Sequence, residues 1–261
     1  MMKSLWNSFK IAFAMFSKIP MPQADWSEEN MRYMLCFFPF VGAAVGAVTL
    51  VSEWICRYLG MSNGLITAIL VLVPVLVTGG IHVDGLLDTS DALSSWRDRE
   101  KRLEILKDSH TGAFAVITAC VYFLAMYGGM SQIVENDNRK MLYILAAGYM
   151  FSRCLSGIGV ITLPKANAGG TVAEFSRKAQ DTRVRSILIV YLVLLAALMI
   201  WIQPVWGITV VVTALLVFWF YVHKAMKYFG GTTGDLSGYF LCLCEVWILL
   251  ALAVVAVIYK I

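Results

Sequence analysis

The sequence predicts an all-α membrane protein: a polytopic transmembrane helical bundle of about seven spans with an N-terminal amphipathic helix, forming a single domain over residues 1–261. Of the 261 residues, 59% are hydrophobic and 15% are charged, against about 45–50% and 25% in soluble domains. Apolar runs of about 20 residues recur along the chain, and each is long enough to cross a bilayer as a helix. The alternating apolar and polar segments of a membrane β-barrel are missing from the sequence.

The first 22 residues are expected to form the amphipathic helix. At about 100° per residue, apolar and basic side chains separate onto opposite sides. The apolar side holds Leu5, Phe9, Phe13 and Phe16, and the basic side holds Lys3, Lys10 and Lys18. Pro20 and Pro22 end the helix. Such a helix lies in the membrane interface or packs its apolar stripe on the bundle, and the pattern fits both arrangements.

Seven apolar segments are expected to span the membrane, with the ranges 34–52, 64–80, 113–130, 141–162, 187–203, 206–222 and 238–259. Only the region from Gln203 to Trp206 separates the fifth from the sixth, which predicts a tight reversal. Gly42 and Gly46 have the spacing of small residues at a close helix contact. The six cysteines lack metal-binding spacing and are expected to be small core residues.

Basic residues outside these spans are distributed unequally. Sixteen lie on the side of the N-terminus and four on the other, so the positive-inside rule places the N-terminus in the cytoplasm. The polar segments 81–111, 164–186 and 223–237 are then expected to share the cytoplasmic face. The arginines between Arg97 and Arg102 are interpreted as a solvated face that sets this topology. The net charge of +4 therefore reflects topology, and no nucleic-acid partner is expected.

The strongest chemical signal is an array of aspartates that follows Gly79-Gly80. Asp84, Asp88 and Asp91 have the spacing i, i+4, i+7, which confines them to an arc of about 60° on a helix. Like charges so placed repel one another unless they share a cation. Mg²⁺ prefers carboxylate oxygens and leaves positions for substrate phosphates. The array predicts a Mg²⁺–diphosphate site, although a solvated acidic helix start would show the same residues.

Further candidates lie in the same polar segment. His82 points away from the aspartates if one straight helix holds all four residues, so its role as a base depends on the break at Gly79-Gly80. Asp108 is a candidate to complete the metal shell, and Lys107 or His110 to contact phosphate. A helix cap is the structural alternative for this second group.

Two ionisable residues fall inside predicted spans, where lipid penalises a charge. Arg153 lies about midway along the fourth span, and Glu245 lies about two turns into the seventh. Such groups normally face the interior of the bundle and have a partner. Arg153 therefore either neutralises a substrate phosphate or pairs with Glu245.

The last polar cluster precedes the seventh span and contains Gly230, Gly231, Thr233 and Gly234. Glycines let backbone N–H groups approach an anion, and the helix N-terminus that follows favours negative charge. The cluster lacks the ending of a P-loop, and a simple turn is the alternative. Asp235 is expected to be an N-cap or another metal ligand.

Together these residues resemble the cobalamin synthase family, the adenosylcobinamide-GDP ribazoletransferases. The matching motifs are Phe38-Pro39-x-Val41-Gly42, Gly79-Gly80-x-His82-x-Asp84-Gly85-Leu86-x-Asp88-x-x-Asp91, Lys107-Asp108-Ser109 with Gly112, Ser152-Arg153, and Gly230-Gly231-x-Thr233-Gly234-Asp235 with Gly238 and Glu245. They follow the order of the family over nearly the whole chain.

The resemblance implies a multi-pass enzyme of the bacterial cytoplasmic (inner) membrane with its active site facing the cytoplasm. Such enzymes transfer the phosphocobinamide moiety of adenosylcobinamide-GDP to a ribose hydroxyl of α-ribazole or its 5′-phosphate, require Mg²⁺ and release GMP. The implied partners are these two substrates and the lipid bilayer, and a homo-oligomer is compatible with the sequence. The implied site has Asp84, Asp88 and Asp91 on the metal, His82, Asp108, Arg153 and Asp235 in catalysis, and Lys107, Gly230, Gly231, Thr233, Gly234 and Glu245 on substrate.

Two other functions use similar residues. A CDP-alcohol phosphotransferase also holds aspartates on membrane helices, but Leu87-Asp88 stands where its pattern requires Ala-Arg. A cation or solute transporter could use the intramembrane charges. Transporters often contain inverted repeats and bind at the midplane, whereas this acidic cluster lies at one membrane face and no repeat is visible in the sequence.

Overall fold

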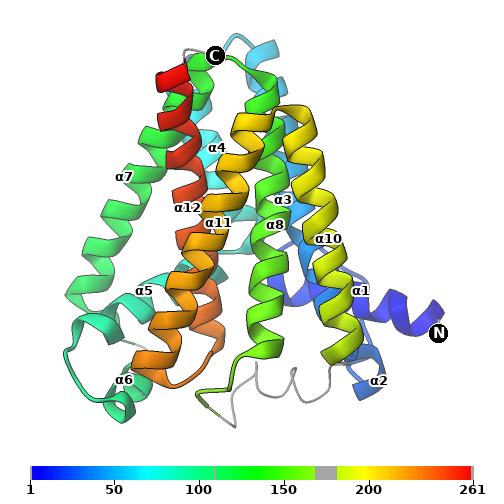
Figure 1. Ribbon diagram of the computed structural model, residues 1–261, viewed down its shortest axis with the longest axis vertical. Helices are drawn as coiled ribbons and strands as arrows, with labels where there is room; N and C mark the ends of the chain where they lie inside the picture. The colour runs from blue at the N-terminus through cyan, green and yellow to red at the C-terminus, as the bar shows by residue number, and fades with distance from the viewer. Residues whose placement is uncertain (1, 109, 168–180, 260–261) are drawn as a thin grey trace.

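The computed structural model describes residues 2–108, 110–167 and 181–259, and within these ranges its regular elements are helices and one isolated bridge between Lys165 and Thr232 (Figure 1). Six of the described helices are long and apolar enough to cross a membrane. They are α3 (Met34–Tyr58), α7 (Ala113–Asn136), α8 (Arg139–Thr162), α10 (Asp181–Ile202), α11 (Pro204–Lys224) and α12 (Gly234–Tyr259). The predicted all-α spanning bundle is confirmed.

The predicted span 64–80 is shorter than expected. Its helix, α4 (Asn63–Thr78), has 16 residues and passes as a seventh span only together with α5 (Ile81–Ser94), which is bent from it by 91°. α5 packs on α12 and α7, where both of those helices begin. We therefore treat α5 as a helix lying across the end of the bundle, outside the spanning segments.

The amphipathic helix α1 (Met2–Phe16) packs on α3. The ring of Phe9 lies 5.8 Å from that of Phe37, and the ring of Phe16 lies 4.3 Å from that of Phe38. The predicted apolar stripe thus contacts protein, as in the bundle-packed alternative. Lys10, on the predicted basic side, is only 8% exposed, and its Nζ donates to the Gln23 carbonyl at 2.8 Å.

The spanning helices extend beyond the predicted apolar runs, since polar residues continue a helix past the hydrocarbon core. α3 reaches Tyr58 rather than residue 52, and α10 begins at Asp181 rather than 187. The predicted tight reversal is confirmed, because only Gln203 separates α10 from α11. Its Oε1 accepts a hydrogen bond from the Trp206 amide at 2.7 Å, which caps α11.

The contact predicted from Gly42 and Gly46 brings α3 against α8. A Cβ atom at Gly42 would lie 2.3 Å from the Tyr149 carbonyl oxygen, and one at Gly46 would lie 2.7 Å from that of Ala146. Any side chain larger than hydrogen would separate the two helices. The glycines therefore place the centre of α8, with Arg153, deep inside the bundle.

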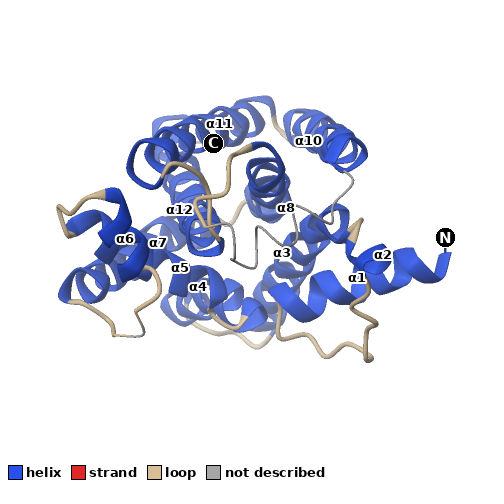
Figure 2. Cartoon of the chain, turned by 90° about the horizontal axis from the view of Figure 1, so that it is seen from below, coloured by secondary structure: helices blue, strands red, loops and turns tan. Residues whose placement is uncertain are grey.

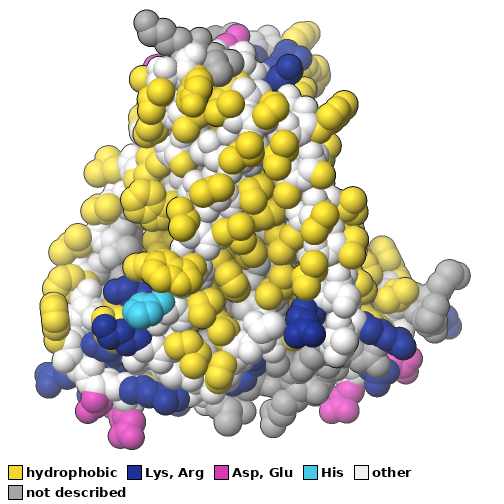
Figure 3. Space-filling view, in the orientation of Figure 1, with side chains coloured by type: hydrophobic (Ala, Val, Ile, Leu, Met, Phe, Trp, Pro, Cys, Tyr) yellow, Lys and Arg dark blue, Asp and Glu magenta, His cyan; other side chains and the backbone are white. Residues whose placement is uncertain are grey.

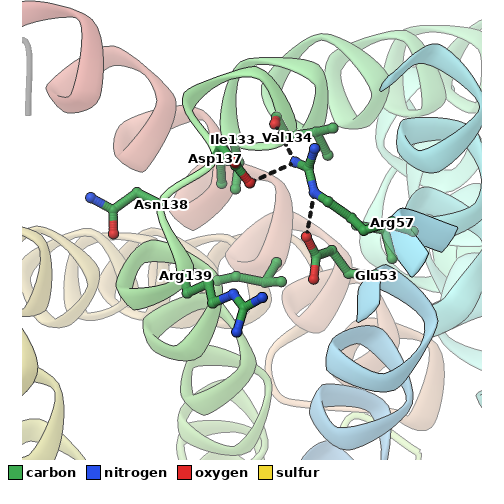
Figure 4. Close-up of a pocket in the computed structure, with 9 residues that line it drawn as sticks. Glu53, Arg57, Ile133, Val134, Asp137, Asn138 and Arg139 are labelled. Atoms are coloured by element: carbon green, nitrogen blue, oxygen red, sulfur yellow. Dashed lines mark hydrogen bonds and ion pairs between the residues drawn. The ribbon is translucent and has the colours of Figure 1, made fainter. Parts of the chain in front are cut away.

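Charged residues gather at the two ends of the molecule and hydrophobic side chains cover its middle (Figure 3). The end away from α5 is held by Arg57, which lies 2.7 Å from Glu53 and 3.1 Å from Asp137 and donates to the Val134 carbonyl (Figure 4). The cavity beside these residues has a volume of about 10 Å³, enough for one water molecule. This cluster ties α3 to α7 and leaves little room for a ligand.

The other end carries the three predicted polar segments. α5 and α6 (Arg99–Ile105) lie there with the first turns of α10 and α12 (Figure 1). The bridge between Lys165 and Thr232 joins the second segment to the third. For the described residues of these segments, which exclude 168–180, the expectation that they share one face is confirmed, and the side of the membrane to which this face belongs stays a prediction.

Candidate active site

Two glycines set the direction of the helix that carries the aspartates. Gly79 (φ 68°) and Gly80 (φ 80°) both adopt the left-handed conformation that glycine tolerates best. α5 then leaves α4 at 91° and runs beside α12, as seen from this end in Figure 2. The break predicted at these glycines is confirmed, and it falls before every site residue of α5.

The aspartates of α5 form a concentrated patch of negative charge. Asp84 is exposed, and Asp88 and Asp91 are half-buried. Burial raises the pKa of Asp88 to about 6, with further contributions from the charges of Asp84, Asp235 and Asp91. Because three other carboxylates act on Asp88, this face of α5 is a place where a cation would relieve repulsion.

Asp235 reaches the same place from the first turn of α12. Gly85 of α5 packs directly on its backbone, since a Cβ atom at Gly85 would lie 2.6 Å from the Asp235 carbonyl oxygen. Gly238 makes the reciprocal contact, where a Cβ atom would lie 3.1 Å from the His82 carbonyl oxygen. These two glycines let α5 and α12 approach closely enough for Asp235 to add a fourth carboxylate.

The donor set fits Mg²⁺ in its chemistry. All four side chains offer carboxylate oxygens, the ligands that Mg²⁺ prefers, and this ion commonly uses only one or two of them beside water and substrate phosphates. In the part of the chain that the structure describes, no group of three or more His, Cys, Asp or Glu side chains is placed so that it could hold a metal ion by itself. An open carboxylate array suits an ion shared with a substrate, and the Mg²⁺ assignment stays a prediction.

Asp91 also has a structural contact. Its Oδ2 accepts a hydrogen bond from the Gly112 amide at 2.7 Å, and its Oδ1 accepts one from the Ala115 amide at 2.9 Å. The carboxylate therefore caps the start of α7 and fixes it against α5. Glycine at 112 is required by this contact, because a Cβ atom there would lie 2.6 Å from Asp91 Oδ1.

His82 lies on the face of α5 opposite the aspartates, as the straight-helix alternative predicts. It is 8% exposed, and its ring centroid lies 6.2 Å from that of Phe38 on α3. Its Nε2 is buried and has no hydrogen-bond partner among the described residues. The structure does not bring His82 to the carboxylates, and its role as a base stays a prediction.

Arg153 and Glu245 pair with each other across α8 and α12. Nη1 of Arg153 lies 2.7 Å from Oε1 of Glu245 and donates to the Tyr149 carbonyl at 2.8 Å. Arg153 is fully buried and Glu245 is 6% exposed. Of the two alternatives for Arg153, the structure shows the ion pair, and it presents neither side chain on the aspartate face.

The predicted anion loop begins at two glycines with positive φ, Gly230 and Gly231. The amide of Gly230 donates to the Met226 carbonyl, that of Gly231 to Ala225, and that of Thr232 to Pro164. These three amides are thus already bonded to protein, which differs from the predicted cradle of free N–H groups. Thr233 Oγ1 accepts from the Leu236 amide at 3.2 Å, in the manner of an N-cap of α12.

Two arginines of α6 lie at this loop, and sequence analysis assigned them only to topology. The guanidinium of Arg99 lies against Gly230, where a Cβ atom would lie 2.2 Å from its Cζ. Arg102 lies over the Tyr228 ring, with 4.6 Å between Cζ and the ring centroid. Both contacts join residues more than a hundred positions apart, so no local pattern in the sequence could have predicted them.

The segment between α6 and α7 is the most exposed part of the predicted site. Asp108 accepts a hydrogen bond from Nδ1 of His110 at 2.6 Å, and this contact lowers the pKa of Asp108. Lys107 is exposed, and Ser109 lies outside the described residues. Asp108 is not among the groups that act on Asp88, so the structure does not join it to the aspartate array.

Known proteins resemble the chain over nearly its whole length. The family model described as cobalamin-5-phosphate synthase matches residues 8–253. An adenosylcobinamide-GDP ribazoletransferase from Lachnoclostridium phytofermentans is 43% identical over 95% of this chain and 94% of its own. A protein of the same name from Clostridium botulinum strain Alaska E43 is 33% identical over 94% and 96%. No solved structure matches. The chain belongs to the cobalamin-5-phosphate synthase family of membrane enzymes.

Proposed function

We propose that this chain is a Mg²⁺-dependent transferase that joins adenosylcobinamide-GDP to α-ribazole or its 5′-phosphate and releases GMP. The observation that carries the proposal is the approach of four carboxylates, those of Asp84, Asp88, Asp91 and Asp235, at one end of the bundle. The 43% identical relative bears the name of this activity. The other product would be adenosylcobalamin or its phosphate.

In the proposed reaction, the ribose hydroxyl oxygen of the acceptor attacks the phosphorus of the phosphocobinamide group. A P–O bond forms there while the P–O bond to GMP breaks, and the hydroxyl proton passes to a base of the enzyme. When bound, Mg²⁺ would neutralise charge on the diphosphate. Positioning and electrostatics supply most of the catalysis in reactions of this class.

The proposed roles of the site side chains differ according to whether each side chain is free to contact an ion or a substrate. Asp84 and Asp88 are the proposed principal ligands of Mg²⁺, because neither is hydrogen-bonded within the described protein as Asp91 is. Asp91 is proposed as a further ligand that also anchors α7. Asp235 is a ligand or the base. For His82 to act as the base, it would have to turn from its buried position on the opposite face.

Charge on the departing GMP needs an accessible cation. Arg99 meets this condition better than Arg153, since Arg99 is exposed beside Gly230 while Arg153 is buried and paired. We therefore assign phosphate binding to Arg99 together with the end of the loop at Thr233 and Gly234. Lys107 and Asp108 are exposed on the neighbouring segment and would join the site only when substrate brings them closer.

The site is proposed to face the cytoplasm from the bacterial cytoplasmic membrane. The excess of basic residues on the end that carries α5 supports this orientation. A nucleotide substrate made inside the cell would then reach the aspartates without crossing the bilayer.

The test is GMP release by the purified full-length protein in detergent, supplied with adenosylcobinamide-GDP, α-ribazole and Mg²⁺. We expect GMP and a cobalamin product, and we expect both to disappear with EDTA. Asp84→Asn should abolish turnover, whereas Glu100→Gln, which removes another exposed carboxylate at this end, should not. Turnover that persists in Asp84→Asn would overturn the metal assignment. Absence of product from folded protein would overturn the reaction.

A further inference from the structure

Three cations surround a single tyrosine ring near the start of the anion loop. The Arg102 Cζ lies 4.6 Å from the centroid of the Tyr228 ring, Lys224 Nζ lies 5.0 Å from it and Lys227 Nζ lies 5.2 Å from it. Each contact is favourable alone, but the three charges lie within about 10 Å of one another, the Debye length in 0.1 M salt. They therefore repel one another.

No described carboxylate neutralises this cluster. The ion pairs of the described residues do not include Arg102, Lys224 or Lys227. The Nε atom of Arg102 is buried and lacks a hydrogen-bond acceptor among the described residues. The cluster thus offers both net positive charge and a free donor, the two features that bind a phosphate group.

An apolar groove leads to the cluster along the surface of α11 and α12. Leu216 and Phe220 line it from α11, and Leu243 and Trp247 line it from α12, around a volume of about 410 Å³. Phe220 is 40% exposed and Trp247 is 53% exposed. Thr213, at the far end of the groove, stands about 10 Å along α11 from Phe220.

Lys224 connects the groove to the cluster. Its Nζ lies 5.3 Å from the Phe220 ring at the end of the groove and 5.0 Å from the Tyr228 ring. Lysine and arginine side chains gather at the lower edge of the apolar face in Figure 3. Long basic side chains over aromatic rings are typical of the boundary between hydrocarbon and headgroups.

We propose that this surface binds an anionic phospholipid, with its phosphate on Arg102, Lys224 and Lys227 and one acyl chain in the groove between α11 and α12. A soluble phosphate would use the cations but not the groove. A second copy in a two-fold dimer would bring the same patch against itself, which sets three unneutralised cations against three more. Only an amphiphilic anion matches both the cation cluster and the apolar groove. The proposal does not depend on the proposed reaction.

Native mass spectrometry of the full-length protein in neutral detergent tests the proposal. The probes are phosphatidylglycerol and phosphatidylcholine with identical acyl chains. We expect the wild-type protein to prefer phosphatidylglycerol, and Lys224→Gln with Lys227→Gln to weaken its binding about 30-fold, the factor for two basic residues near an anionic surface. Ala251→Trp, which fills the groove, should weaken the binding of both lipids.

The matched control is Lys3→Gln with Lys101→Gln, which removes two exposed lysines from the same end. This control variant should keep the preference for phosphatidylglycerol over phosphatidylcholine. Equal binding of the two lipids by the wild-type protein would overturn the proposal without reference to any variant. So would an equal loss in the control pair, a dimer as the main species, or GMP binding that depends on Lys224 and Lys227 while phosphatidylglycerol binding does not.

Discussion

Replacing one member of the Arg153–Glu245 pair is expected to destabilise the protein far more than replacing both. Arg153 is fully buried, Glu245 is 6% exposed, and their nearest charged atoms are 2.7 Å apart. Removing one partner leaves the other charge buried without its counter-ion, at a cost of roughly 3–5 kcal/mol. Replacing both by apolar residues of similar volume removes the two charges together and is often close to neutral.

Thermal unfolding in detergent measures this difference in Arg153→Met, in Glu245→Leu, and in the double variant that carries both changes. At roughly 2–4 °C for each kcal/mol in a chain of this size, we expect each single variant to lose roughly 6–20 °C and the double variant only a few degrees. Arg57→Met with its partner change Glu53→Gln is the control cycle. That pair has the same 2.7 Å separation but side chains that are 30% and 13% exposed, so its coupling should stay below roughly 1 kcal/mol.

The reasoning would be refuted if the double variant lost as much stability as the two single variants together. Such additivity would mean that the two side chains do not interact energetically. Turnover separates the two alternatives for Arg153. If the pair only holds α8 against α12, the folded double variant should release GMP at nearly the wild-type rate. Loss of turnover at wild-type stability would instead support the predicted contact of Arg153 with phosphate.

Four further predictions follow from the site. The pKa of Asp88 is raised to about 6, so if Asp88 holds Mg²⁺ as proposed, protons compete with the ion below this pH. At limiting Mg²⁺ the rate of GMP release should then fall about tenfold per pH unit below 6 and recover with excess Mg²⁺. Because Asp88 loses its proton as the pH rises above its pKa, Mg²⁺ should also raise the melting temperature more at about pH 7.5 than at about pH 5, which scanning fluorimetry would measure. Asp91→Ala removes two hydrogen bonds to the start of α7 and should lower the free energy of unfolding by about 1–3 kcal/mol. An unchanged free energy of unfolding would contradict the capping role of Asp91. Arg99→Gln should raise KM for adenosylcobinamide-GDP or lower kcat without lowering the melting temperature, and an unchanged steady-state profile would remove Arg99 from the site.

The features predictable from sequence are those set by local composition. Each spanning helix is marked in the sequence by an apolar run long enough to cross the hydrocarbon core. Such a run is predicted to be helical because lipid offers no hydrogen-bond partner to an unpaired backbone. The bend between α4 and α5 was predictable from Gly79-Gly80, since two adjacent glycines permit the left-handed conformation observed there. The pairing of Arg153 with Glu245 was one of two stated alternatives, because a buried charge needs a partner.

The features that were not predictable depend on which helices meet. Arg99 and Arg102 have the composition of a solvated, topology-setting segment. Only the packing of α6 against Tyr228, in the helical stretch Ala225–Phe229 that continues α11, and against Gly230 gives them other contacts. Lys10 follows the period of a basic stripe but turns to the Gln23 carbonyl. Asp91 has the spacing of a metal ligand, and its second use as a cap becomes visible only when the start of α7 is placed beside it.

α5 explains how several repelling carboxylates can be held together before any ion arrives. The helix is fixed on three sides by contacts that do not involve Asp84 or Asp88: Gly85 packs on the backbone of α12, Asp91 caps α7, and His82 packs on Phe38 of α3. Packing on those helices opposes the repulsion that would separate the carboxylates of a flexible loop. Burial of Asp88 raises its pKa most, and the charges of Asp84, Asp235 and Asp91 raise it further. Carboxylates held in place in this way would be stabilised by a cation among them without first having to be brought together, which is the role proposed for Mg²⁺.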